Sequence, residues 1–396
     1  MRVLRRGKAP VQAAAGFRRT ELAWQLITAG ILLWGAFCFP AQARARKGVE
    51  LIGRWAPQAT APGATWAGSS VLLSFSKSSF VAADLIAGRT QAPPTDSKIY
   101  ISLSIDGGER RRIGLEYGKH SGFVLASGLS HDAHTVAVRY ENEPYFGSLQ
   151  FANPTLEAGG EWRRIRDNKP IVEVIGDSDA TGICALGPLS PAVPARLFTA
   201  EWASQSVSWP GLLETKLAAL GHPVEVVDLA ISGSTAASEA TAYELAAPQF
   251  SDSKFVAYSG QRHVSLALLW GGINDHNHGG DLGTGTPIAV GNLSPFQRGV
   301  FDQITKIFAR SPHARIGLLD YIDPVFGTPD WKPAYLQVTS LLTKSERKQI
   351  FMLDVTDPPG TSNACDVDPK GHPSQSMHES WAAQIVAWMV SQNLVQ

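Results

Sequence analysis

Residues 169–178 read Lys-Pro-Ile-Val-Glu-Val-Ile-Gly-Asp-Ser, and this stretch decides the fold of the second half of the chain. Its apolar run, 171–175, is short and ends in glycine and polar residues, which is typical of a buried strand followed by a tight turn. Further short apolar runs follow at 224–229, 264–270, 316–319 and 350–355. Helical patterns separate them at 210–220, 239–246, 295–309 and 334–348. Apolar strands alternating with helices predict an α/β domain over 169–396, with a parallel sheet covered on both faces.

Residues 48–160 have a different pattern. Runs at 71–75, 98–105, 112–117 and 135–140 read as short strands divided by Gly, Pro, Ser and Asp. Asp106-Gly107-Gly108 is a tight turn between two of these runs. The stretch therefore predicts an all-β domain, either a sandwich or a jelly roll, and the polar segment 162–168 predicts the linker to the α/β domain.

The N-terminus predicts an export signal. Basic residues from Arg2 to Arg19 precede a largely apolar run at 22–39, and Ala41-Gln42-Ala43 offers the small-x-small pattern of a signal-peptidase site. We expect residues 1–43 to be a signal peptide and the protein to be periplasmic or secreted. The alternative is an uncleaved membrane anchor, because the run approaches the length of a spanning helix. Membrane association is expected only in that case.

The composition excludes several classes of protein. The 396 residues include 35 Lys and Arg against 35 Asp and Glu, so the formal net charge is zero, and 44% of them are hydrophobic. The hydrophobic fraction argues against a mainly disordered chain, and the charge balance gives no attraction for nucleic acid. His276 and His278 lie in a glycine-rich loop without a third ligand at metal-site spacing. We expect neither a metal site nor a cofactor.

Polar, glycine-flanked groups follow three of the predicted strands, where ligands bind in open α/β sheets. They are Gly176-Asp177-Ser178, Ser232-Gly233-Ser234 and Gly272-Ile273-Asn274-Asp275, and a fourth, Gly371-His372-Pro373-Ser374, precedes the last helix. In this order the four groups resemble the Ser, Gly, Asn and His blocks of the SGNH hydrolases. The resemblance implies Ser178 as nucleophile, Gly233 and Asn274 as oxyanion donors and His372 as base, on a flavodoxin-like sheet.

The chemistry of ester hydrolysis requires the same residue types. A serine hydroxyl is a weak nucleophile until a histidine accepts its proton, so Ser178 needs His372. Attack on an ester creates an oxyanion, which the backbone N–H groups of Ser178 and Gly233 and the side-chain amide of Asn274 would stabilise. Glycine suits the second position because it lets the backbone approach the substrate closely.

The segment before His372 carries two further predictions. Asp368, or else Asp366, is the candidate acid that orients the imidazole, and a Ser-His dyad without an acid is the alternative. Cys365 is predicted to form a disulfide with Cys184, because the loops that carry them run close together if nucleophile and base meet. Export would supply the oxidising compartment. Two separate buried thiols are the alternative.

The first half also resembles a specific family. Gly53-Arg54-Trp55, Trp66-Ala67-Gly68-Ser69-Ser70, Ile105-Asp106-Gly107 and His134-Thr135-Val136 resemble the β domain that precedes the catalytic domain in family-2 carbohydrate esterases. Glu201-Trp202-Ala203 fits the same family. The resemblance implies a serine esterase that removes O-acetyl groups from polysaccharides or oligosaccharides through an acyl-enzyme. Two alternatives stay open: another SGNH ester hydrolase, acting on lipid or peptidoglycan O-acetyl esters, and a non-catalytic glycan-binding protein.

Overall fold

The computed structural model describes residues 47–56, 61–89, 97–165, 168–187, 199–243, 263–277, 289–321, 330–357, 363–364 and 372–395. The predicted signal peptide, 1–43, lies outside these ranges. Within them, no helix is long and apolar enough to span a bilayer. Ala45–Gln396 form one compact unit, which contains both halves of the chain that the sequence distinguishes.

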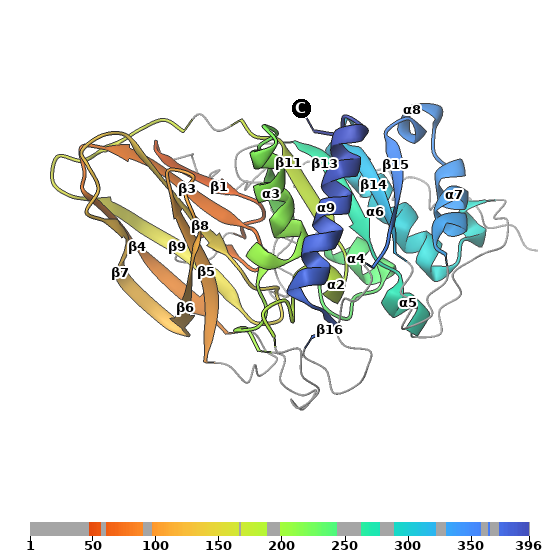
Figure 1. Ribbon diagram of the computed structural model, residues 1–396, viewed down its shortest axis with the longest axis horizontal. Coiled ribbons are helices and arrows are strands. Elements are labelled where there is room, and N and C mark those ends of the chain that lie inside the picture. The colour runs from red at the N-terminus through yellow and green to blue at the C-terminus, as the bar shows by residue number, and fades with distance from the viewer. Residues whose placement is uncertain are drawn as a thin grey trace, which may run out of the picture. The chain divides into compact units, whose positions relative to one another are not determined.

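The first half folds as two antiparallel sheets whose inner faces share one core (Figure 1). The described strands of one sheet are ordered β1-β3-β8-β5-β6, with β10 paired to β3, and those of the other are ordered β2-β9-β4-β7. The bounds are β1 Val49–Ile52, β2 Gly63–Ala64, β3 Ser70–Ser76, β4 Phe80–Gly88, β5 Lys98–Ile105, β6 Arg111–Glu116, β7 Gly118–Ser127, β8 His134–Tyr140, β9 Ser148–Leu156 and β10 Glu161–Trp162. Alternate side chains point inward, so Leu73, Leu85, Ile101 and Val138 meet between the sheets. The predicted β-sandwich is confirmed.

The second half is an α/β fold around a parallel sheet. Its described strands are ordered β12-β11-β13-β14-β15. The bounds are β11 Ile171–Ile175, β12 Glu225–Asp228, β13 Val264–Trp270, β14 Arg315–Tyr321 and β15 Ile350–Val355. This is the flavodoxin-like order, because the second strand along the chain lies outside the first. The order reverses between β11 and β13, which is where such sheets bind ligands.

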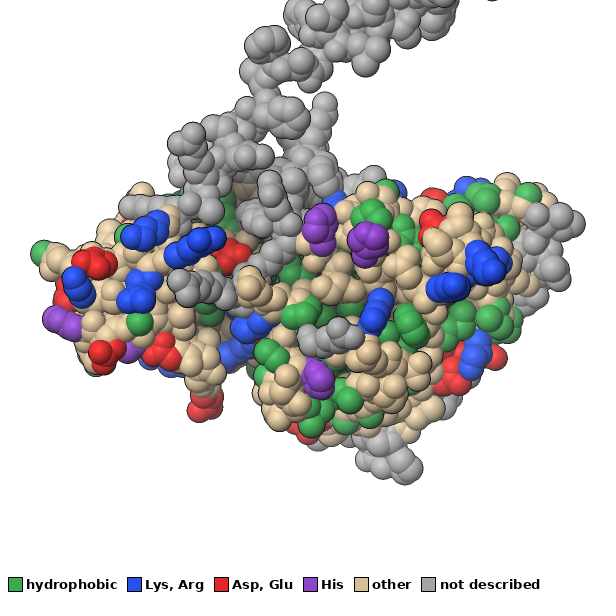
Figure 2. Space-filling model, turned by 90° about the horizontal axis from the view of Figure 1, so that it is seen from above, with side chains coloured by type: hydrophobic (Ala, Val, Ile, Leu, Met, Phe, Trp, Pro, Cys, Tyr) green, Lys and Arg blue, Asp and Glu red, His purple; other side chains and the backbone are tan. Residues whose placement is uncertain are grey.

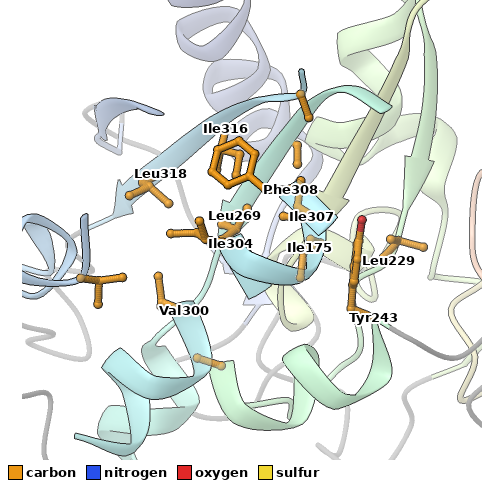
Figure 3. Packing of buried hydrophobic residues seen from close by; sticks show 14 of the residues in the cluster. Ile175, Leu229, Tyr243, Leu269, Val300, Ile304, Ile307, Phe308, Ile316 and Leu318 are labelled. Atoms are coloured by element: carbon orange, nitrogen blue, oxygen red, sulfur yellow. The ribbon is translucent and has the colours of Figure 1, made fainter. Parts of the chain in front are cut away.

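Helices cover both faces of the parallel sheet, as predicted. α3 (Trp209–Ala219) and α9 (Gln375–Ser391) pack on one face, whereas α4 (Ala236–Ala242), α6 (Pro295–Arg310) and α7 (Lys332–Ser340) pack on the other (Figure 1). Figure 3 shows the core on the second face, where Ile304 and Ile307 of α6 lie among Ile175, Leu269 and Ile316 of the strands. These apolar contacts hold the strand ends in fixed positions.

One predicted helix is wrong. The pattern at 334–348 predicts one continuous helix, but the chain forms α7 and then a separate short helix, α8 (Lys344–Arg347). The side chain of Thr343 accepts from the N–H of Glu346 over 3.3 Å, and the carboxylate of Glu346 accepts from the N–H of Thr343 over 2.8 Å. This reciprocal capping box starts a new helix at Lys344 and so ends the first one early.

The first half covers the edge of the parallel sheet at β12. Trp66 is fully buried in the core between that sheet and α6. Beside it, the N–H of Asp228 donates to the carbonyl of Ala67 over 3.0 Å. Gly68 lies so close to the strand that a Cβ would be 2.6 Å from the carbonyl oxygen of Val226. The β domain therefore covers part of the hydrogen-bonding edge of β12, which would otherwise be exposed.

Ion pairs cross the same interface. Arg54 pairs with Glu173 of β11 at 3.3 Å, and both side chains are buried. Arg139 of β8 pairs with Glu214 of α3 at 2.6 Å and with Glu225 of β12 at 3.3 Å. Loss of one partner would leave a buried charge unpaired, which is strongly destabilising. On the face shown in Figure 2, by contrast, the exposed basic and acidic side chains of the first half are interspersed.

Candidate active site

Ser178 lies in a tight turn between β11 and the short helix α2 (Ser178–Thr181). Gly176 permits the turn, because a Cβ at this position would lie 2.6 Å from the carbonyl oxygen of Trp270. Asp177 caps the helix, since its Oδ1 accepts from the N–H of Asp179 over 3.1 Å. The N–H of Ser178 is at the first helical position, where no carbonyl of the helix can accept it. This amide is therefore available to an oxyanion.

Gly233 lies at the tip of the turn that follows β12. The turn is closed by a hydrogen bond from the N–H of Ser234 to the carbonyl of Ile231, over 3.1 Å. Gly233 has a φ of +77°, which the third residue of a type II turn requires and side chains other than glycine rarely adopt. It is exposed, and a Cβ there would meet no described atom within 4 Å. None of the described residues fills the space beside Gly233, so a substrate can approach its N–H from that side.

Hydrogen bonds tie the three predicted oxyanion donors together. The carbonyl of Gly176 accepts from the N–H of Ile231 over 2.9 Å and lies 3.2 Å from the Oγ of Ser234, which joins the Gly233 turn to the turn that carries Ser178. Asn274, on α5 (Ile273–Asn277), donates from Nδ2 to the carbonyl of Ser234 over 2.9 Å. An amide nitrogen carries two hydrogens, so one anchors the side chain and the second can serve an oxyanion.

Asn274→Ala should lower kcat for a small acetyl ester by about 10²–10³-fold and change KM less, because this donor matters most when charge develops on the acyl oxygen. Steady-state kinetics of the purified variant would measure both constants. Asn277→Ala, which removes an exposed asparagine at the other end of α5, is the matched control and should keep the wild-type kcat. A change confined to KM would make Asn274 a substrate-binding residue instead.

His372 lies on β17 (His372–Pro373), which pairs with β16 (Asn363–Ala364) and contacts both α2 and α9. The half-buried imidazole is thus on the segment that borders the nucleophile helix. The neighbouring His378 is fully buried, and its Nδ1 accepts from the N–H of Trp209 over 3.2 Å. Burial, with a smaller contribution from His372, lowers the pKa of His378 to about 3. His378 is therefore a neutral core residue, which leaves His372 as the candidate base.

Three predicted residues lie outside the described ranges: Asp366, Asp368 and Cys365. The choice of triad acid between the two aspartates, or a dyad, therefore stays a prediction. Cys184 is described: it is buried in the segment after α2 and packs in a cluster with Tyr100 and Phe146 of the β domain. Its predicted disulfide with Cys365 also stays a prediction.

The buried carboxyl groups of Glu239 and Asp275 lie beneath the site. The sequence did not identify Glu239 as a residue that supports it. Glu239 of α4 accepts from the Oγ of Ser234 over 2.8 Å and from Nε2 of Gln303 over 3.0 Å. Asp275 accepts from the N–H of Ala236 over 3.0 Å, so it links α5 to the start of α4. Burial raises the pKa of Glu239 to about 8, and Asp275 adds to the rise. In the described ranges, no group of three or more His, Cys, Asp or Glu side chains is arranged to hold a metal ion.

Glu239→Gln should stabilise the protein increasingly as the pH rises from about 5 to 9. The pKa of Glu239 in the folded protein is about 8, above its ordinary value of 4.5, so folding favours the protonated form. Stability is therefore greatest below the unfolded pKa and falls as the pH rises through 8, by up to a few kcal/mol. A neutral glutamine can keep both hydrogen bonds without this dependence. Urea unfolding at several pH values would measure the difference, and an equal difference at pH 5 and pH 9 would contradict the explanation.

Comparisons with known proteins find similarity in both halves of the fold. The family model of the carbohydrate esterase 2 N-terminal domain matches residues 51–164. No curated protein matches the sequence. Among solved structures, the chain is similar to a family-two carbohydrate esterase from Clostridium thermocellum in complex with cellohexaose, with 17% identity, a TM-score of 0.65, and coverage of 87% of this chain and 99% of that one.

Two further structures are similar over most of their length. An acetyl xylan esterase from the rumen bacterium Butyrivibrio proteoclasticus has 13% identity and a TM-score of 0.67, with coverage of 89% of this chain and 96% of that one. A carbohydrate esterase family 2 enzyme with a carbohydrate-binding domain, from Corynascus thermopiles (Myceliophthora fergusii), has 21% identity and a TM-score of 0.62, with coverage of 87% and 98%. Residues 51–164 thus match the model of the carbohydrate esterase 2 N-terminal domain, and the chain shares the two-part fold of these solved structures.

Proposed function

We propose that the protein is a serine carboxylic ester hydrolase that removes O-acetyl groups from carbohydrate through an acyl-enzyme. The observation that carries the proposal is the meeting of the Ser178, Gly233 and Asn274 segments at the edge of the sheet where the strand order reverses. They are joined there through the carbonyls of Gly176 and Ser234. A hydrolase needs one nucleophile and several convergent donors at one place, whereas a binding module does not.

The mechanism follows from the chemistry of these groups. The Oγ of Ser178 attacks the ester carbonyl carbon while His372 accepts the hydroxyl proton, and the carbonyl oxygen becomes an oxyanion. The N–H groups of Ser178 and Gly233 and the amide of Asn274 donate to that oxyanion. When the C–O bond breaks, the sugar oxygen leaves with the proton from His372. Water then attacks the acetyl-serine by the same route, which releases acetate and restores Ser178.

The carbohydrate substrate rests on the comparisons. Residues 51–164 match the N-terminal domain of a carbohydrate esterase family. One similar structure holds cellohexaose, and another is an acetyl xylan esterase. Lipid or peptidoglycan O-acetyl esters remain the alternative substrates, and a glycan-binding protein without turnover is the alternative outside enzymes. The intact set of Ser178, Gly233, Asn274 and His372 favours the enzyme.

Acetate release is the experiment that tests the function. The purified chain would be incubated with acetylated xylan, acetylated glucomannan, O-acetylated peptidoglycan and a short-chain triglyceride, each beside Ser178→Ala. The proposal expects acetate from an acetylated polysaccharide, at a rate the variant does not reach. Acetate or fatty acid release from peptidoglycan or triglyceride alone would show that the proposed substrate class is wrong. Tight glycan binding without any release would show that the protein is a glycan-binding protein rather than an enzyme.

Export is part of the proposal. The basic segment, the apolar run at 22–39 and Ala41-Gln42-Ala43 support cleavage after Ala43 and a periplasmic or secreted location, where polymeric substrates are found. N-terminal sequencing of the protein recovered outside the cytoplasm would test it. An intact N-terminus in the membrane fraction would favour the anchor.

A further inference from the structure

Glu141, Asn142 and Glu143 follow β8 and leave the β domain toward the α/β half. Glu141 accepts from the Oγ of Ser204 over 3.0 Å, and Asn142 donates from Nδ2 to the carbonyl of Ala200 over 3.1 Å. All three side chains are buried, at 0% to 1% exposure. This segment, 141–143, therefore fastens the two halves together through side chains rather than through sheet pairing.

Glu143 reaches a different place from its two neighbours. Its Oε2 accepts from the N–H of Ser232 over 2.7 Å, and its Oε1 accepts from the Oγ of the same residue over 2.6 Å. On the other side, the Oγ of Ser232 lies 3.4 Å from the Oγ1 of Thr181 on the nucleophile helix. Ser232 is thus held between a carboxylate of the β domain and the helix that begins with Ser178.

This contact bears on the oxyanion hole because Ser232 immediately precedes Gly233. The carboxylate holds both the backbone nitrogen and the side chain of Ser232, so that residue has little freedom to rotate. The peptide that carries the N–H of Gly233 comes next in the chain. Its direction then follows from the closed turn and from the φ of +77° at Gly233. The carboxylate of Glu143 therefore restrains the residue that directly precedes the N–H of Gly233.

Stability alone does not explain a carboxylate in this position. Glu143 is 1% exposed, and burial raises its pKa to about 7. Its stabilising partners among the described residues are the two groups of Ser232, with no Lys or Arg. By contrast, Glu214 at the same interface is paired with Arg139. A buried carboxyl group without a cation costs folding free energy, which points to a role in the site instead.

We propose that Glu143 is a positioning residue for the oxyanion hole, which orients the N–H of Gly233 through its two hydrogen bonds to Ser232. This inference rests on the proposed esterase function and deepens it. It makes the β domain a part of the catalytic apparatus, in addition to any part it has in holding carbohydrate.

The test compares Glu143→Ala with Glu143→Gln in the full chain, with 4-nitrophenyl acetate as the probe. Glu143→Ala should lower kcat by about 10²-fold with KM changed by less than about 3-fold, because a misdirected donor fails mainly in the transition state. Glu143→Gln should recover most of the loss. Its oxygen can accept from the N–H of Ser232, and its amide can donate to the Oγ of the same residue. Peptides containing Ser232 should also exchange amide hydrogen faster in Glu143→Ala than in the wild type.

Two controls separate positioning from a general weakening of the interface. Asn142→Ala removes only the buried hydrogen bonds of the Asn142 side chain, next to Glu143 in the segment. It should lower the stability of the protein while leaving kcat near the wild-type value. Ser232→Ala should lower kcat by about 10-fold, and its combination with Glu143→Ala should cost less than the product of the single effects, since both act through one contact.

The outcomes distinguish the positioning role of Glu143 from the proposed esterase function. Wild-type kcat in a folded Glu143→Ala, or an equal loss of kcat in Asn142→Ala, would overturn the positioning role while leaving the esterase intact. A failure of Glu143→Gln to recover activity in a folded protein would overturn the hydrogen-bond account. If the wild type shows no hydrolysis that depends on Ser178, the proposed function itself fails. In that case the exchange measurement still reports whether Glu143 holds the turn, but the catalytic role is refuted.

Discussion

Ser178→Ala should reduce kcat for a small acetyl ester by about 10⁴–10⁶-fold, the largest effect expected of any substitution in the chain. The variant keeps the predicted oxyanion donors at Gly233 and Asn274, so it should still bind and polarise an ester, but it has no oxygen with which to form the proposed acyl-enzyme. Steady-state kinetics with 4-nitrophenyl acetate, and acetate release from the best polysaccharide, would measure the loss.

The fold should survive this substitution, because α2 is capped by the side chain of Asp177 and anchored by Ala180 in the core, and neither depends on the Oγ of Ser178. Equal circular dichroism and an equal urea midpoint would establish this. A serine-reactive fluorophosphonate provides a second readout: it should add its mass to the wild-type peptide that contains Ser178 and not to the variant. Turnover in the variant within 10-fold of the wild type would exclude Ser178 as the nucleophile.

His372→Ala should be nearly as damaging as Ser178→Ala, because members of a catalytic unit lose activity together rather than additively. The double variant should therefore be little worse than either single one. His378→Ala is an unsuitable control, since His378 is buried in the core and accepts from the N–H of Trp209. His276→Ala, on the half-buried face of α5, is the better comparison and should keep most of the activity.

The acid can then be chosen by comparing Asp368→Asn with Asp366→Asn. If a residue orients His372, converting its carboxylate to an amide should lower kcat by several orders of magnitude, because the imidazole then adopts the wrong tautomer. The other residue should tolerate the change. Near-normal turnover in both variants would favour a Ser-His dyad, and a loss of activity only in Asp366→Asn would reverse the prediction.

The α/β half could be predicted well because burial on both faces leaves a plain pattern. β11, β13 and β15 begin and end where the apolar runs predict, and the polar residues after β11 and β13 supply Ser178 and Asn274. The β domain was harder to predict strand by strand. β7 is an edge strand with mostly exposed side chains, and β4 is rich in alanine, so neither shows the strict alternation of a half-buried strand.

The supporting residues of the site could not be predicted, because their roles depend on partners far away in the sequence. Glu143 precedes a proline in a loop and resembles any polar residue after a strand, yet it contacts Ser232 in the other half. Glu239 looks like an exposed helix residue, but packing against α6 buries it beneath Ser234. The local sequence pattern shows which residues are apolar, but it does not show which carboxylates become buried in the folded protein.

The cover that Ala67 and Gly68 provide along β12 limits how such a chain can be divided. An α/β half expressed alone, from about residue 169, would lose Trp66 from its core and would present an uncovered strand edge to other molecules. It would therefore tend to self-associate rather than remain a smaller working unit. The linker at 162–168 looks in the sequence like a joint between independent modules, but exchange of the β domain for an unrelated one would have to rebuild that edge. The β domain and the α/β half therefore form a single structural unit.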